Sequence, residues 1–272
     1  MANLRQNACI RVTPRRRSAF TLTELVVAIG VVALLIGILM PSLAGVREHA
    51  RRVVCGSNLR QIGLGVHMYA DQSDSQLPAS VFLGDAGDIS QRTDESYRPQ
   101  DMVTVRIVAD TSNSRQVEPD PNRWDGLGLL FAGGYLSAPQ VYYCPSHRGE
   151  FRFEEYADHW TGAPGEIVSN YHFRGQGPNQ STRLHLIDQN AAIVSDSLRS
   201  LEELNHEGGL NVLSAGLSVS WLADERGTIA SILSMAGGDG DGDSDIADRL
   251  WGELDGGDIG GGGTNAPNAN GG

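Results

Sequence analysis

Residues 20–40 read FTLTELVVAIGVVALLIGILM and decide the fold of the chain. As a helix rising about 1.5 Å per residue, this run is just long enough to cross the roughly 30 Å hydrocarbon layer of a membrane. Arg15, Arg16 and Arg17 stand directly before it. Because basic residues mark the cytoplasmic end of a membrane helix, we expect a single-pass protein with a cytoplasmic N-terminus. The folded body is then expected on the periplasmic side of the inner membrane.

Glu24 is the one charged residue inside this apolar run. An ionised carboxylate is costly in a bilayer, so a residue of this kind normally marks a function. The alternative is a glutamate in the first helical turn, where the helix dipole favours negative charge near the interface. The residue type alone leaves both interpretations open.

Residues 15–25, RRRSAFTLTEL, resemble the cleavage and methylation signature of type IV pilins and type II secretion pseudopilins. The resemblance implies that prepilin peptidase cuts between Ala19 and Phe20 and methylates the new N-terminus of Phe20. Ala19 stands where this family usually has glycine. The resemblance also implies that Glu24, the fifth residue after the cut, pairs with the Phe20 amine of a neighbouring subunit. A buried charge that is too costly alone is tolerated in such a pair.

Apolar residues recur at spacings of three and four beyond the membrane run, as is typical of an amphipathic helix. They are Leu43, Val46, Ala50, Val53, Val54, Ile62, Val66 and Tyr69. The pattern predicts one helix over about residues 20–70, bent at Pro41, whose second half lays an apolar stripe on a sheet. The resemblance implies the pilin-like α+β fold, with a long N-terminal helix packed on an antiparallel β-sheet.

Later segments are similar to a subset of large pseudopilin-like proteins of planctomycete-type bacteria. The similar segments are residues 55–63, 69–71, 77–78, 126–130, 134–136, 143–146, 170–175 and 192–196. That subset often closes its domain with a histidine, nine residues and then Asp-Gly. His206 fits the first half, but Gly216 and Leu217 stand in place of Asp-Gly, so we interpret His206 as structural. Residues 211–213 and 218–222 are predicted to form a hairpin.

Composition divides the chain into four parts. We expect a basic leader at residues 1–19 that is removed, and a transmembrane and assembly helix at residues 20–41. A pilin-like globular domain is expected at residues 42–235, and a Gly/Asp-rich, flexible and disordered tail at residues 236–272. Inside the domain, residues 84–122 are polar and are interpreted as an insertion, with a short strand predicted at residues 103–108.

Cys55 and Cys144 remain as an even pair once the leader, which carries Cys9, is lost. They lie 89 residues apart and lack the close C-x-x-C pairing of metal sites, so no metal site is predicted from them. In an oxidising compartment they can form one disulfide. Two buried free thiols are the alternative.

Four aspartates in the C-terminal segment form a weak calcium candidate. Asp239, Asp241, Asp243 and Asp245 alternate with small residues, a spacing that gathers carboxylates as a calcium loop does. The twelfth position of such a loop would be Leu250, which cannot act as a ligand. A solvated tail is the alternative, and no other cofactor is expected.

The sequence predicts a structural subunit of a pilus or of a type II secretion pseudopilus. A net charge of -12 argues against nucleic acid as a partner for the main body of the chain. The expected partners are prepilin peptidase, other pilin or pseudopilin subunits and the lipid bilayer. The chain contains no G-x-S-x-G, H-E-x-x-H or P-loop motif, so we predict that it is not an enzyme.

Two other functions stay open. The first is a secreted soluble binding module whose signal peptide is cut after Ala44, which would leave Gly45 at the N-terminus. The second is a membrane-anchored hydrolase, in which histidines and aspartates such as Asp188 and Asp196 come together only in the folded chain.

Overall fold

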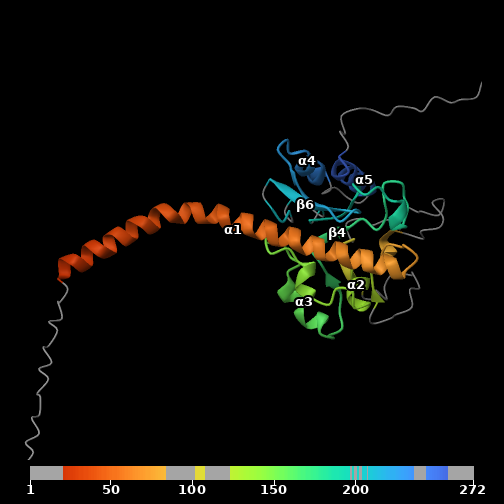
Figure 1. The fold of residues 1–272 in the computed structure, drawn as a ribbon, viewed down its shortest axis with the longest axis horizontal. Helices are drawn as coiled ribbons and strands as arrows, with labels where there is room; N and C mark the ends of the chain where they lie inside the picture. Colours follow the sequence, from red (N-terminus) through yellow and green to blue (C-terminus); the bar gives the residue numbers. More distant parts are fainter. Residues whose placement is uncertain are drawn as a thin grey trace, which may run out of the picture. The chain divides into compact units, whose positions relative to one another are not determined.

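The computed structural model describes residues 21–83, 102–107, 123–196, 198, 201, 204–206, 208–235 and 243–256. The chain divides into two compact units, Met1–Arg47 and Glu48–Gly272. Helix α1 (Leu22–Gln72) begins in the first unit, passes Pro41 without a break and ends in the second (Figure 1). The prediction of one helix over about residues 20–70 is therefore confirmed.

The first unit consists, as far as it is described, of the N-terminal part of α1. Its stretch Leu22–Met40 is long and apolar enough to cross a membrane, and none of it is buried. Leucine, isoleucine and valine side chains therefore project from the whole circumference of this helix. A helix that is apolar all round needs a nonpolar environment, such as lipid or other helices.

Two antiparallel sheets form the β-structure described in the second unit, which confirms the α+β class. The larger sheet has the order β4-β5-β6-β7, with strands Tyr171–Phe173, Ala192–Asp196, Gly209–Ser214 and Val219–Ala223. The smaller has the order β2-β1-β3, with strands Arg123–Trp124, Thr104–Ile107 and Ile167–Val168. β6 and β7 pair from Gly209 with Ala223 to Leu213 with Val219, so the predicted hairpin is confirmed.

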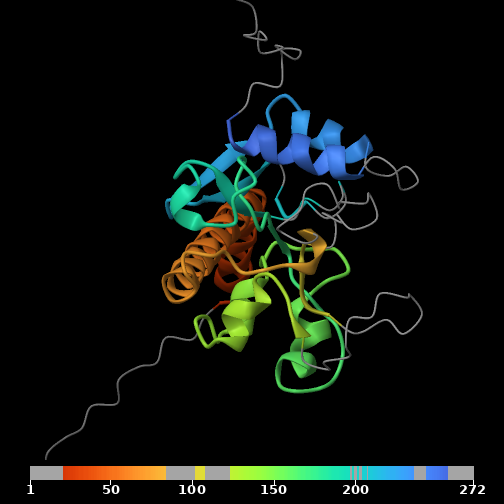
Figure 2. The same ribbon diagram turned by 90° about the vertical axis from the view of Figure 1, so that its right-hand side faces the viewer.

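Short helices fill the spaces around these sheets. They are α2 (Gly128–Ala132), α3 (Phe153–Trp160), α4 (Thr228–Met235) and α5 (Asp243–Leu254), with single 3₁₀ turns at Val81–Leu83, Pro139–Tyr142 and Leu184–Leu186. α4 and α5 lie side by side (Figure 2).

Both faces of the larger sheet are covered by a hydrophobic core. β6 contributes to both cores because successive side chains point to opposite faces of the sheet. On β6, Leu213 packs in the core that includes Leu59 and Ile62 of α1. Leu210 and Val212 join a second core with residues of α4 and α5. α1 approaches β6 so closely at Gly63 that a Cβ there would lie 2.9 Å from the Leu213 Cδ1 atom. The predicted packing of the long helix on an antiparallel sheet is confirmed.

The predicted apolar stripe on α1 is wrong in its first half. The buried apolar side chains are Cys55, Leu59, Ile62, Val66 and Ala70, whereas Ala50 and Val54 are exposed. At 3.6 residues per turn, Val46 and Val53 lie nearly opposite Cys55, and both are exposed. The face that continues the buried stripe toward the N-terminus carries Glu48 and Arg52, which an apolar pattern cannot detect.

The short strand predicted at residues 103–108 is confirmed as β1, the central strand of the smaller sheet, and Met102, Val103 and Val105 are buried. One prediction about a segment needs correction. Part of the predicted flexible tail is the ordered helix α5, because Leu250, Trp251 and Leu254 provide an apolar face that packs on the second core. The other residues of 84–122 and 236–272 lie outside the described part of the chain.

Arg106 of β1 holds the loop after α3 in place. The residue is 2% exposed. Its Nε donates to the carbonyl of Gly165 at 2.7 Å, its Nη1 to that of His159 at 2.8 Å and its Nη2 to that of Ala163 at 2.6 Å. One planar guanidinium therefore satisfies one carbonyl of the last turn of α3 and two of the loop after it.

Arg106→Lys is expected to lower the free energy of unfolding by about 2–4 kcal/mol, because an ammonium cannot reproduce the planar fork and leaves partly buried carbonyls unpaired. Urea unfolding of the detergent-solubilised protein, followed by tryptophan fluorescence, measures this loss. The matched control is Arg183→Lys, since the half-exposed Arg183 pairs with Asp74 at 3.0 Å. Its loss is expected to stay below about 1 kcal/mol. Equal urea midpoints for the two variants would contradict the assigned role of Arg106.

Candidate functional site: the helix start and a buried thiol cluster

Glu24 closes the first turn of α1. Its Oε2 accepts hydrogen bonds from the Thr21 backbone N at 2.9 Å and from the Thr21 Oγ1 at 2.8 Å. The Glu24 backbone N donates in return to Thr21 Oγ1 at 3.3 Å. This reciprocal arrangement is a capping box, in which both side chains satisfy backbone donors at a helix start. The carboxylate is nevertheless exposed, so a positive group of another molecule can reach it.

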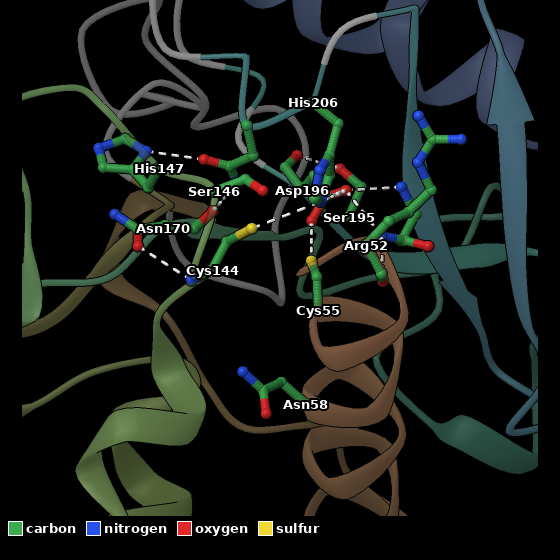
Figure 3. Close-up of polar contacts among 12 residues, drawn as sticks. Arg52, Cys55, Asn58, Cys144, Ser146, His147, Asn170, Ser195, Asp196 and His206 are labelled. Atoms are coloured by element: carbon green, nitrogen blue, oxygen red, sulfur yellow. Dashed lines mark hydrogen bonds and ion pairs between the residues drawn. The ribbon is translucent and has the colours of Figure 1, made fainter. Parts of the chain in front are cut away.

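A second group of chemically active side chains lies buried in the second unit. One ligand-type atom from each of Cys55, Cys144, Asp196 and His206 lies within 4.8 Å of the other three. Cys55 Sγ donates to Asp196 Oδ1 at 2.6 Å, and Cys144 Sγ lies 3.4 Å from His206 Nε2. The same Nε2 lies 3.7 Å from Asp196 Oδ2. Figure 3 shows the two thiols pointing toward the aspartate and the histidine. We call these four residues the thiol cluster.

Four different segments supply the thiol cluster. Cys55 lies on the buried face of α1, and Cys144 follows the 3₁₀ turn Pro139–Tyr142. Asp196 ends β5, and His206 lies in the segment that leads into β6. All four are at most 4% exposed. The cluster therefore sits where the helix, the sheet and two connecting segments meet.

Hydrogen bonds from outside the cluster fix the histidine and the aspartate. His206 Nδ1 lies 2.6 Å from Glu48 Oε1, and Ser146 Oγ donates to both oxygens of that carboxylate at 3.1 and 3.0 Å. Asp196 Oδ2 accepts from the backbone N of Asn211 at 2.6 Å and from its Nδ2 at 3.2 Å. The ring of His206 and the carboxylate of Asp196 are thus each held in one orientation.

Burial and neighbours shift the pKa values of the thiol cluster. Burial lowers the pKa of His206, but Cys144, Asp196 and Glu48 more than compensate and raise it to about 9. Burial raises the pKa of Asp196 and, with the help of Cys144 and Asp196, raises that of Cys55. For Cys144, burial is outweighed by hydrogen bonds with Cys55 and His206, which lower its pKa. Of the two thiols in the cluster, Cys144 is therefore the more easily deprotonated.

The cysteines are free thiols in the structure, although the fold brings them together. The disulfide between Cys55 and Cys144 stays a prediction. No local pattern in the sequence predicts a cluster of four, because Cys55 and Asp196 stand 141 residues apart. A signal was present, however: three of the cluster residues lie in the segments 55–63, 143–146 and 192–196, and His206 belongs to the closing motif.

The other predicted site residues lie apart from this cluster. Ala19 and Phe20 lie outside the described residues, as do Asp239 and Asp241. Asp243 and Asp245 belong to the first turn of α5, so their backbone is helical rather than looped. Calcium binding there stays a prediction. Asp188 is exposed and accepts a hydrogen bond from the Asn190 backbone N, whereas Asp196 is buried, so the two do not form a common site.

Cys144, His206 and Glu48 line up in the manner of a nucleophile, its base and an orienting carboxylate. A nucleophile must touch its substrate, however, and Cys144 is 4% and His206 2% exposed. The Cys144 thiol lies in the protein interior, beside Cys55 and Asp196. This arrangement suits a group bound inside the domain better than a reaction with an external substrate.

Comparison with known families gives two matches. Residues 14–40 match the model described as the prokaryotic N-terminal methylation motif. Residues 45–192 match the model SBP_bac_10, described as a protein of unknown function (DUF1559). No curated protein and no solved structure matches the chain. The resemblance to pilins and pseudopilins is confirmed by the first match, and the similarity of the later segments is consistent with the second.

Proposed function

The chain belongs to the DUF1559 family, whose model covers more than half of it, and on that premise we propose that this pilin-like protein is a structural subunit of an assembly. Prepilin peptidase removes the leader between Ala19 and Phe20 and methylates Phe20. The N-terminal helix then joins those of other subunits in a pilus or a type II secretion pseudopilus. The globular domain lies on the periplasmic side of the inner membrane.

The observation that carries this proposal is the exposed apolar helix with a carboxylate at its start. Side chains of Leu22–Met40 are exposed in the part of the chain that the structure describes. Before assembly a bilayer covers them, and in an assembly the helices of neighbouring subunits do. Glu24 is exposed at the end that enters the membrane from the cytoplasm, where it can accept the Phe20 amine of a neighbour.

The nature of the mature N-terminus tests the proposal. Protein isolated from membranes is expected to begin with N-methylated Phe20, as read by mass spectrometry of its N-terminal peptide. Cells that lack prepilin peptidase provide the control, because there the chain is expected to keep residues 1–19. A mature chain that begins at Gly45 would instead support the secreted binding module, and an uncut leader in normal cells would refute processing.

A further inference from the structure

We propose that Cys55, Cys144, Asp196 and His206 form a structural site for one zinc-class divalent cation inside the globular domain. This inference does not depend on the proposed assembly function. It rests on the geometry of the four side chains, on the residues that orient them, and on their burial.

The separations between the ligand atoms of the cluster are close to those around a zinc ion. A tetrahedral zinc ion with bonds of about 2.0–2.3 Å holds its ligand atoms about 3.3–3.8 Å apart. Cys144 Sγ lies 3.4 Å from His206 Nε2, which lies 3.7 Å from Asp196 Oδ2. The 2.6 Å between Cys55 Sγ and Asp196 Oδ1 is shorter, and these two atoms need to separate by about 1 Å. The four side chains come from four segments, and one ligand-type atom of each lies within 4.8 Å of the other three.

Residues around the cluster orient its histidine and its aspartate. A histidine that binds a metal almost always gives its other ring N–H to a carboxylate, a carbonyl or water. His206 has Nε2 toward the cluster and Nδ1 at 2.6 Å from Glu48, whose carboxylate is in turn bonded by Ser146. Asn211 fixes Asp196 through two donors to Oδ2. Such orienting contacts are typical of metal ligands.

A disulfide or a catalytic thiol would use fewer of the four side chains than a bound cation does. A disulfide needs the two sulfur atoms alone and leaves Asp196 and His206 as buried ionisable groups beside it. A catalytic thiol needs access to solvent, which Cys144 lacks. A bound divalent cation uses all four side chains and replaces the two thiol protons and the proton on His206 Nε2.

The ligand types select the class of cation. Two thiolates and an imidazole suit zinc and similar borderline-soft metals, whereas calcium and magnesium take oxygen ligands. Four protein ligands complete a tetrahedron and leave no open position for a substrate or water. The site is therefore of the structural kind, and it joins α1 to β5 and to the segments that carry Cys144 and His206.

The full-length protein tests the site, with Cys9→Ser introduced so that leader retention does not add a third thiol. Protein purified in detergent without added chelator is expected to contain about one equivalent of zinc per chain by elemental analysis. After chelation, Co²⁺ added to the protein is expected to produce a thiolate-to-cobalt charge-transfer absorption. Denaturation in the presence of chelator should then release two titratable thiols.

Matched variants separate ligands from bystanders. Cys144→Ser is expected to abolish the cobalt charge-transfer band or to weaken it strongly. Glu48→Gln, which keeps all four ligands, is expected to lower zinc affinity about 10–100-fold through loss of the orienting carboxylate. The control His67→Gln alters a histidine of the same helix that bonds the Ala215 carbonyl instead, so its zinc affinity should be unchanged.

Two results would overturn the site. The first is Cys9→Ser protein, whose four cluster residues are unaltered, with no bound metal, no cobalt absorption after reduction and chelation, and two reactive thiols. The second is protein without metal whose thiols appear only after reduction, which would establish the disulfide between Cys55 and Cys144 instead. Because both are read on wild-type side chains in the cluster, they hold even if a variant fails to fold. Neither result bears on processing at Phe20.

Discussion

Glu24→Val is expected to reduce crosslinked oligomers in membranes by more than about tenfold while leaving membrane insertion intact or improved. The variant removes a costly carboxylate from an apolar helix, so insertion has no reason to fail. In the assembly, however, the Phe20 amine of a neighbour would lose its partner and stay charged among apolar helices. Breaking a buried charge pair from one side is strongly unfavourable. Site-specific crosslinking of wild-type and variant subunits measures the difference.

Thr21→Val is the matched control for this experiment. It removes the side-chain partner of Glu24 in the capping box but keeps the carboxylate. If pairing with the neighbour is what matters, Thr21→Val assembles nearly as well as wild type. If both variants lose oligomers equally, the helix cap explains the effect and the pairing idea fails. Equal oligomer yields for Glu24→Val and wild type would also defeat it.

Trp251→Ala is expected to lower the free energy of unfolding by about 3–5 kcal/mol, the usual loss when a buried large aromatic is truncated. Trp251 is 3% exposed and belongs to the second core, together with residues of α4 and with Leu210 and Val212 of the larger sheet. The guanidinium carbon of Arg174 lies over the Trp251 ring, 5.4 Å from the ring centroid. Urea unfolding followed by circular dichroism measures the loss without depending on the tryptophan signal.

Gly252→Ala tests whether the loss is specific to the packed face of α5. A Cβ at this helical position would meet nothing within 4 Å. Alanine is a better helix former than glycine, so this variant should be unchanged or more stable by up to about 1 kcal/mol. If Trp251→Ala is as stable as Gly252→Ala, the C-terminal segment is a loose tail after all.

The parts of the fold that sequence could predict are those with a local pattern. The apolar run of residues 20–40 and its upstream arginines mark a membrane helix whatever the rest of the chain does. The hairpin of β6 and β7 is also local, because a turn joins two alternating strands. β5 was located by its resemblance, and its bounds, Ala192–Asp196, agree with the predicted segment.

The thiol cluster could not be predicted because no local pattern encodes it. On α1 the half-buried residues that continue the buried face toward the N-terminus, Glu48 and Arg52, are charged, so apolar periodicity assigned the wrong face to this part of the helix. The prediction of a flexible tail over the residues that form α5 was wrong for a related reason. Glycines and aspartates on both sides dominate the composition, and the short apolar pattern of Leu250, Trp251 and Leu254 is visible only once its partner surface is known.

The buried face of α1 also sets the order of events during synthesis. Cys55 is made early, but Asp196 follows 141 residues later. At about 5–20 residues per second, roughly 7 to 30 s pass before the sheet that covers Leu59 and Ile62 can exist. Contacts so distant in sequence close slowly. The nascent chain therefore carries an uncovered apolar face on α1 until synthesis has passed β6.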